Sequence, residues 1–315
     1  MPTRINYQHR LKLKMLKNLR MAISSIKVDD RIRSLIFLFF IFIFIVIIAT
    51  ILYDILPLTI AYSLWGQDSF YAGLVTNMHS SAIDFLFFSI VLYIIMTKHE
   101  KHGKIKQYQE NIDDTRFWMS EEAAFKNYAN IRRLQELGIN SIDISKCTLS
   151  YTKSKNLNFS NSKIMGAILD FANFEGSKFS QTSFRGAFAI STSFNNVKII
   201  ECSMDYIKLK NGKMRSSYLD DVSFEKAELD DTDFHSTVFT NCNFKNSSLQ
   251  GCNMERTDLR KSRELTIEQL LSCKSLKYAR LDEELEIEIR AIRPELLGKA
   301  PQKPAHLRKA LPPSR

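Results

Sequence analysis

Residues 164–184 read IMGAILDFANFEGSKFSQTSF, with a large apolar residue at every fifth position. The same period holds from residue 144 to residue 259, where only Ser154 and Ala189 interrupt it. The residue two places before each of these positions is small or short in most cases. A helix repeats every 3.6 residues and a strand every 2, so neither produces this pattern. A backbone that turns one large and one small residue inward in every five forms a solenoid, whose stacked coils share one core.

These five-residue units resemble those of the pentapeptide-repeat family, as in AILDF (167–171), TSFRG (182–186) and CNFKN (242–246). The resemblance covers about 144–261 and implies a mainly β fold, a right-handed quadrilateral β-helix with four units per coil. Independent support for a twenty-residue coil comes from one set of central residues, which recurs as Leu149, Leu169, Ala189, Leu209, Leu229 and Leu249. The repeat then makes about six coils, roughly 29 Å tall at a strand spacing of ~4.8 Å.

Several residues predict details of this solenoid. Glycines occur two residues after central positions, where a tight corner favours a positive φ: Gly166, Gly176, Gly186 and Gly251. Ser154 and Ala189 underfill their core positions, so we expect local compensation there.

Both ends of a stacked β-solenoid need a cover, because their open edges would otherwise associate. At the C-terminal end, Thr266 and Gln269 form a capping-box pattern for a helix to about Cys273, and a second helix is expected from Glu283 to Ile292. At the other end, Ser120 is the expected N-cap and Gly138 the C′ residue of a helix that covers the first coil. The expected apolar stripe of this helix comprises Phe125, Tyr128, Ile131, Leu134 and Leu137.

Two apolar segments precede the repeat. Residues 35–52 contain no charge over eighteen positions, which is nearly enough helix to cross a ~30 Å hydrocarbon layer. Residues 83–96 are too short alone, so the second spanning helix should begin upstream, near Gly73. The sequence therefore predicts a two-helix transmembrane hairpin.

The positive-inside rule predicts the orientation of this hairpin. Residues 54–80 contain no Lys or Arg. Cations gather before the first helix and after the second: Arg4, Arg10, Lys12, Lys14, Lys17, Arg20, Lys27, Arg31, Arg33, Lys98, Lys101, Lys104 and Lys106. We expect a multi-pass protein of the bacterial inner membrane with both termini and the repeat domain in the cytoplasm.

The expected organisation has six parts. They are a basic cytoplasmic segment (1–33), the transmembrane hairpin (34–97), a helical stalk and N-terminal cap (98–138), the pentapeptide-repeat β-helix (139–262), a helical C-terminal cap (263–298) and a disordered tail (299–315).

Composition excludes several classes of function. The formal net charge of +10 is spread along the chain and partly flanks the hairpin, so it gives poor support for nucleic-acid binding. Five cysteines contain no C-x-x-C pair, and the phosphate-binding and nucleophile-elbow glycine motifs are absent. His99 and His102 are three residues apart, whereas the H-E-x-x-H zinc motif needs four. We therefore expect no enzyme activity, no metal and no cofactor.

Two groups of polar residues are candidate sites. Asn77, Ser81 and Asp84 share one face of the second membrane helix, either as a polar pore or oligomer seam or, in the simpler interpretation, near the outer headgroups. An acidic stretch comprises Asp220, Asp221, Glu225, Glu228, Asp230, Asp231 and Asp233. It is either a DNA-like row of carboxylates, as the resemblance to topoisomerase-binding members of the family implies, or a solvated face of mixed charge, because lysines and Arg215 lie nearby.

Three functional hypotheses follow. The first is a non-enzymatic scaffold or sensor, tethered to the lipid bilayer, that offers a flat solenoid face to an unknown cytoplasmic protein. The second is an oligomeric membrane effector whose hairpins form a pore or disrupt the bilayer in stress or antiphage defence. The third is a topoisomerase-binding DNA mimic. The partner, the oligomeric state and the face that is used stay open.

Overall fold

The computed structural model describes residues 30–55 and 68–298. They belong to two compact units, residues 1–102 and residues 103–315. Most of the predicted basic segment, part of the predicted hairpin loop and the whole of the predicted disordered tail lie outside the described residues, at 1–29, 56–67 and 299–315.

The first unit contains helix α2 (Asp30–Ile55) and most of helix α3 (Asp68–Asp114). The sequence predicts that the second apolar helix begins near Gly73 and that a helical stalk follows from residue 98. Helix α3 begins at Asp68 and runs without a break through residue 98 and Gly103, for 47 residues in all. No proline interrupts this stretch, and each of its two glycines, Gly73 and Gly103, costs the helix only ~1 kcal/mol, so the apolar and polar halves form one helix.

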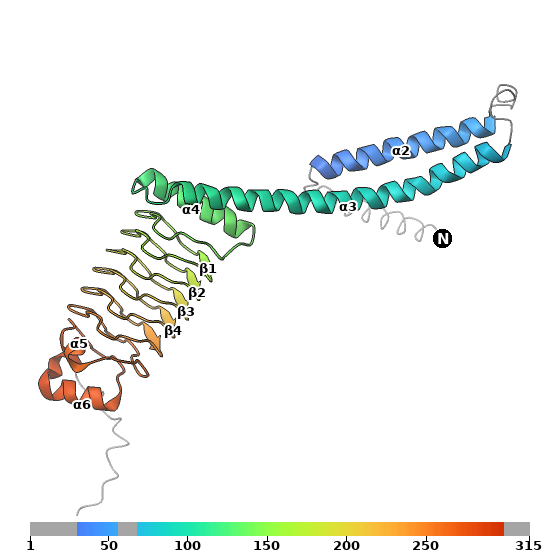
Figure 1. Cartoon of the computed structure of the whole chain (residues 1–315). Helices are drawn as coiled ribbons and strands as arrows, with labels where there is room; N and C mark the ends of the chain where they lie inside the picture. Colours follow the sequence, from blue (N-terminus) through green and yellow to red (C-terminus); the bar gives the residue numbers. More distant parts are fainter. Residues whose placement is uncertain (1–29, 56–67, 299–315) are drawn as a thin grey trace, which may run out of the picture. The chain divides into compact units, whose positions relative to one another are not determined.

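Helices α2 and α3 lie side by side in this unit (Figure 1). The rings of Phe42 and Phe85 stack with centroids 5.4 Å apart, and Val46 and Ala82 are buried beside them. The other faces of both helices expose large apolar side chains, among them Phe37, Phe40, Phe44, Ile83, Phe87 and Phe88. Among the described residues, one helical stretch has the length and apolarity of a membrane span, Thr76–Asp114, and the apolar stretch Phe37–Ile48 of α2 is shorter.

The second unit is built around a parallel β-solenoid, as predicted. One face is a five-stranded parallel sheet in the order β1-β2-β3-β4-β5. Its strands are β1 (Asn158–Ser160), β2 (Lys178–Ser180), β3 (Lys198–Ile200), β4 (Tyr218–Asp220) and β5 (Val238–Thr240). Every pairing joins residues twenty positions apart, such as Phe159 with Phe179, which confirms the twenty-residue coil.

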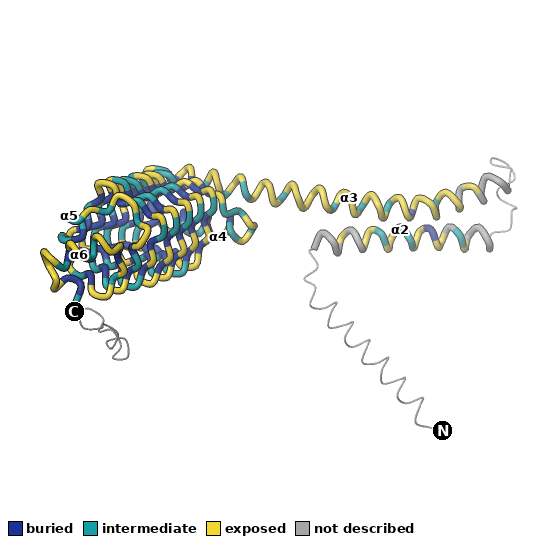
Figure 2. The backbone as a smooth tube through the Cα atoms, turned by 90° about the horizontal axis from the view of Figure 1, so that it is seen from below, coloured by how far each residue is buried: buried dark blue, intermediate teal, exposed yellow. Residues whose placement is uncertain are grey.

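The other three faces are held by single parallel bridges with the same spacing. Six successive bridges on one of them connect Asp143, Lys163, Ser183, Ser203, Ser223, Asn243 and Arg263. The repeat thus makes the six coils expected from its length. The central residues of the coils are buried, while the residues on either side of them, apart from the buried Thr148, are partly or fully exposed (Figure 2).

The small central residues Ser154 and Ala189 are both fully buried. The hydroxyl of Ser154 lies 2.8 Å from that of Thr152, and the Ser154 carbonyl accepts a hydrogen bond from Ser177. Hydrogen bonding therefore compensates for the missing apolar volume at Ser154.

The corners have positive φ, as predicted, but glycine is not required there. Gly176 has a φ of 71°, yet Asn156 and Tyr206 hold φ values of 56° and 57° at equivalent corners. The N–H of each of these three residues donates to a carbonyl of the next coil. This inter-coil bond stabilises a conformation that L-residues otherwise disfavour.

Helix α4 (Glu121–Glu136) covers the first coil, and the Ser120 side chain caps it by accepting the N–H of Ala123. Its side chains satisfy backbone groups at the open edge. Asn127 donates to the Thr148 carbonyl at 3.2 Å, and Gln135 both donates to the carbonyl and accepts from the N–H of Asn158. The cap thus supplies the hydrogen bonds that a preceding coil would have made.

The predicted apolar stripe of this helix is wrong at one residue. Ile131 and Leu134 are buried against the solenoid core, but Phe125 is exposed. The buried face instead continues through Ala123, Ala124 and Asn127. Small residues let the helix approach the coil closely, and the amide of Asn127 is needed at the edge.

The C-terminal cap is α5 (Ile267–Leu271), α6 (Glu283–Ile292) and the 3-10 helix η2 (Pro294–Leu296). The predicted capping box of Thr266 and Gln269 is present in α5. The bridge ladder also continues beyond the predicted end of the repeat, with Asp258 paired to Arg280. Its last step is 22 residues, because α5 is inserted, and a strict count of five therefore misses this partial coil.

Candidate functional site

The polar trio predicted on the membrane helix is not covered by helix α2. Asn77, Ser81 and Asp84 are all exposed, whereas the residues of α3 that face α2 are Ala82 and Phe85. The trio is thus on a face of α3 that the described part of the hairpin leaves uncovered.

The seven predicted acidic residues do not form one row. The bridge register distributes them over all four faces of the solenoid: Asp220 lies on β4, Glu228 and Asp233 lie in bridges of two other faces, and Glu225 follows Phe224 on the fourth. Asp221 and Asp231 lie at corners.

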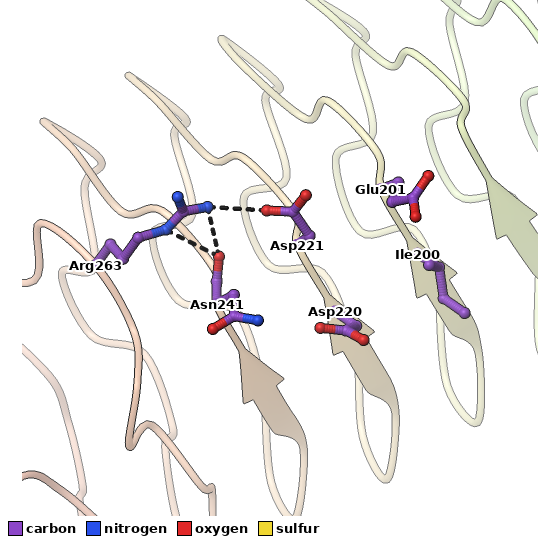
Figure 3. A pocket seen from close by; sticks show the side chains of 6 residues that line it. All are labelled: Ile200, Glu201, Asp220, Asp221, Asn241 and Arg263. Carbon is purple, nitrogen blue, oxygen red and sulfur yellow. Dashed lines mark hydrogen bonds and ion pairs between the residues drawn. The ribbon is translucent and has the colours of Figure 1, made fainter.

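Most of these carboxylates have cationic neighbours. Lys210 lies 3.1 Å from Glu228 and 3.5 Å from Asp230, and the Arg215 guanidinium donates to Asp233 at 2.6 Å. Figure 3 shows the hollow in which Asp220 and Asp221 lie. There Arg263 donates to the Asp221 carboxylate at 2.9 Å and to the carbonyl of Asn241. The structure therefore presents mixed charge rather than a continuous acidic strip.

The cysteines offer no reactive group. All five, Cys147, Cys202, Cys242, Cys252 and Cys273, are free and buried. Burial raises the pKa of Cys147 and of Cys202 to about 11 and that of Cys242 to about 12, so these thiols are protonated at neutral pH. In the described parts of the chain, no group of three or more His, Cys, Asp or Glu side chains is arranged to bind a metal ion.

These thiols make a testable prediction. At pH 8 we expect iodoacetamide to label the cysteines of the folded protein about 100-fold more slowly than those of the urea-unfolded chain. An added surface cysteine, Asn241→Cys, should react at the unfolded rate and serves as the control. Rapid labelling of Cys147 in the folded protein would contradict the burial of its thiol.

The same thiols predict how stability depends on pH. Burial raises the pKa of the Cys147 thiol in the folded protein from its ordinary value near 9 to about 11, so the free energy of unfolding should fall as the pH rises from about 9 towards 11.

Another surface, on one face of the solenoid, has the features of a binding site. The face centred on Leu149, Leu169, Ala189, Leu209, Leu229 and Leu249, here the leucine face, carries large apolar residues that point outward on its first three coils. We define the apolar patch as Tyr151, Ile168, Phe171, Phe188 and Ile190. Tyr151 and Phe171 stack at 4.9 Å, and Ile168 is bridged to Phe188.

The three aromatic rings of the patch are exposed, and Ile168 and Ile190 are partly buried. Tyr151 is 56% exposed, Phe171 50% and Phe188 39%. On the other faces Met165 is a single exposed residue, and the largest exposed apolar group is the pair of Tyr218 and Val238, which are register partners on the β1–β5 face. One carboxylate lies among these residues, because Asp170 follows Leu169 on the second coil and accepts the N–H of Ile190 at 2.7 Å. A largely apolar patch with a polar border is typical of an interaction site.

Charged rows follow the patch along the same face. The bridge ladder of this face reads Thr148, Ile168, Phe188, Lys208, Glu228 and Ser248. The fourth coil therefore presents Lys208 and Lys210, and the fifth presents Glu228 and Asp230. The Lys208 ammonium lies 4.9 Å from the centre of the Phe188 ring, at the border of the patch.

The comparisons with known proteins agree with this fold. A family model described as pentapeptide repeats matches residues 142–181 and 217–260, in eight copies. The search of curated proteins found no match.

Solved structures with similar folds include HetL, a pentapeptide repeat protein involved in heterocyst differentiation regulation from the cyanobacterium Nostoc sp. strain PCC 7120. It is 15% identical, with a TM-score of 0.37 over 48% of this chain and 62% of HetL. A pentapeptide repeat protein of the Arabidopsis thaliana thylakoid lumen is 17% identical, with a TM-score of 0.19 over 35% of this chain and 70% of its own. QnrB1, a plasmid-mediated fluoroquinolone resistance protein, is 15% identical, with a TM-score of 0.20 over 44% of this chain and 88% of its own. At these values the likenesses carry no information about function.

Proposed function

Since this chain contains a pentapeptide-repeat solenoid, we propose that it is a membrane-tethered scaffold that binds a cytoplasmic protein on its leucine face. The apolar patch is the observation that carries this proposal. Phe171 and Phe188 remain exposed on a solenoid whose other outward positions are mostly polar, and burying such rings is the usual source of interface affinity. The solenoid then acts as a rigid platform rather than as a catalyst.

The hairpin supplies the tether in this proposal. The large apolar side chains on the outer faces of α2 and α3, such as Phe40 and Phe87, are exposed in the described hairpin. A lipid bilayer would cover this surface, and the apolar part of α3 is long enough for a span. The distribution of Lys and Arg favours an inner-membrane location with both termini and the solenoid in the cytoplasm.

The proposal predicts the loss of partner binding from one substitution. Phe188→Asp should reduce crosslinking of the partner to the full-length protein in its native membrane by at least about tenfold, because the variant places a charge in the apolar patch. Val238→Asp is a matched control, since Val238 occupies the same place in its five-residue unit on the β1–β5 face and is 37% exposed. Crosslinking followed by mass spectrometry measures both variants.

The results for Phe188→Asp and Val238→Asp together test whether the partner docks on the leucine face. An undiminished partner crosslink in Phe188→Asp, or an equal loss in Val238→Asp, would contradict docking on the leucine face.

A second candidate function rests on the polar trio. Asn77, Ser81 and Asp84 lie on an exposed face of α3, and a carboxylate on such a face is costly in lipid. Assembly of several hairpins would cover these side chains and could form a conducting centre, with the protein acting as an oligomeric membrane effector. This function predicts that overexpression depolarises the membrane and that Asp84→Leu abolishes the effect. A membrane-potential dye in intact cells measures it, and an unchanged potential with abundant wild-type protein would eliminate it.

The DNA-mimic hypothesis is disfavoured. A DNA-like strip needs carboxylates along one face, whereas the seven acidic residues are divided among four faces and several of them pair with Lys210, Arg215 or Arg263. Failure of the full-length protein to protect gyrase from a quinolone would remove this option.

A further inference from the structure

We propose that the partner binds as a single amphipathic α-helix lying along the leucine face, parallel to the axis of the solenoid. Its apolar residues would contact the apolar patch, its next turn would carry acidic residues over Lys208 and Lys210, and the following turn would carry basic residues over Glu228 and Asp230. This inference rests on the proposed function and specifies the chemistry of the partner.

The dimensions of the face fit one helix. The outward side chains of each coil lie two residues apart on an extended backbone, or about 6.6 Å, which suits a helix about 10 Å wide. The coils follow one another at about 4.8 Å, and one helical turn rises 5.4 Å. A helix along the axis therefore places about one turn over each coil, with a mismatch of only about 3 Å after five coils.

The order of apolar and charged coils along the leucine face determines the order of residues expected in the partner's helix. Three coils present the apolar patch, the fourth presents two lysines, and the fifth presents Glu228 and Asp230. A complementary helix therefore carries apolar side chains on three successive turns, then an acidic turn, then a basic turn. The chain direction is free, so the order can also be read from the basic end.

The charged rows are available for such a partner. Lys210 contacts Glu228 and Asp230 across the two coils, but the side chains of Lys210 and Glu228 are 44% and 42% exposed, and that of Asp230 is 22% exposed. Exposed ion pairs of this kind contribute little, about 0–1 kcal/mol, so a partner can replace them without a large cost.

An added β-strand is a poorer fit than a helix. Strand addition needs an open sheet edge, and the edges of this solenoid lie at its two ends. Helix α4 covers the first coil through Asn127 and Gln135, and the Gln269 side chain of α5 donates to the carbonyls of Phe244 and Ser247 near the other end. Along the leucine face the backbone N–H groups already donate to the next coil, as Leu169 does to Phe188. A partner on this face would therefore contact side chains rather than pair with the backbone.

A display selection tests the proposal. A library of 20-residue helical peptides with one face randomised is selected on the full-length protein in lipid nanodiscs, after removal of peptides that bind empty nanodiscs or the Phe188→Asp variant. We expect enriched peptides to carry apolar residues on three successive turns followed by an acidic and then a basic turn. They should bind the wild type at least about tenfold more tightly than Phe188→Asp, whereas Val238→Asp should bind like the wild type.

A charge exchange tests the order of the rows. In the double variant Lys210→Glu with Glu228→Lys, the net charge is unchanged but the rows are partly reversed, so the selected peptides should lose about tenfold in affinity. Peptides with the acidic and basic turns exchanged should gain by a similar factor. Exchanging Arg263 and Asp221, an ion pair off the leucine face whose side chains are 58% and 59% exposed, as Arg263→Asp with Asp221→Arg, is the matched control and should change neither affinity.

The peptide selection and the crosslink of the native partner test the helix proposal and the scaffold function separately. Failure to enrich helical peptides, or an order that ignores the charge exchange, overturns the helix proposal. If the native partner still loses its crosslink in Phe188→Asp, the scaffold function survives that failure. If the peptides behave as expected but the native crosslink persists in Phe188→Asp, the proposed function fails and the helix-binding site stands.

Discussion

Phe179→Ala is expected to lower the free energy of unfolding of the solenoid by about 3–5 kcal/mol. Phe179 is buried at the centre of β2, with its ring stacked on Phe159 at 5.3 Å and edge-on to Phe184 at 5.0 Å. It also contacts the rings of Phe174 and Phe194. Neighbouring coils are fixed by their backbone bridges, so they cannot collapse into the cavity. Urea denaturation of the full-length protein in detergent, followed by far-UV circular dichroism, measures the change.

The neighbouring residue provides the control. Lys178 lies in the same strand but is exposed, so Lys178→Ala should change the stability by no more than about 0.5 kcal/mol. A loss below about 1 kcal/mol in Phe179→Ala would mean that the stacked aromatic core is not the main source of stability.

The repeat could be predicted from sequence because its signal is strictly periodic. One inward residue in five determines the coil, and stacked coils place like residues together, so the leucines from Leu149 to Leu249 already indicated the twenty-residue register. The bridges from Asp143 to Arg263 keep this register throughout.

The ends of the solenoid were harder to predict, because hydrogen bonding decides them rather than periodicity. Asn127 is polar and yet fully buried in α4, since its amide pairs with the Thr148 carbonyl at the coil edge. A search for an apolar stripe selects Phe125 instead. At the other end, Leu276 and Leu281 continue the core after α5, but the two extra residues hide them from a count of five.

The binding face could in principle have been found in the sequence. Apolar residues flank the central positions of this face on two coils, at Ile168, Phe188 and Ile190, whereas equivalent positions on other faces are mostly polar. The signal depends on sorting outward residues by face, and only then does the apolar patch become contiguous. The acidic stretch, in contrast, looks like a single row in the sequence but is not one in the structure. Its residues are close in sequence, yet they lie on different faces of the solenoid.

Leu134→Asp is expected to detach the N-terminal cap and lower the free energy of unfolding by about 3 kcal/mol or more. Leu134 has no exposed surface and packs against the solenoid core, so the substitution both removes apolar volume and buries a carboxyl group. Without α4, the contacts of Asn127 with Thr148 and of Gln135 with Asn158 are lost. The open edge of the first coil would then associate with a second copy.

Two measurements report whether the edge of the first coil becomes exposed. Hydrogen exchange should accelerate at the Asn158 amide, which donates to the Gln135 side chain, and light scattering after size exclusion should show an increased mass. Arg132→Asp is the matched control, because its side chain lies on the same helix and is 57% exposed. It should leave both readouts unchanged. If Leu134→Asp accelerated exchange equally in every coil, the cap would be one cooperative unit with the whole solenoid. If it produced neither effect, α4 would not be the element that protects the edge.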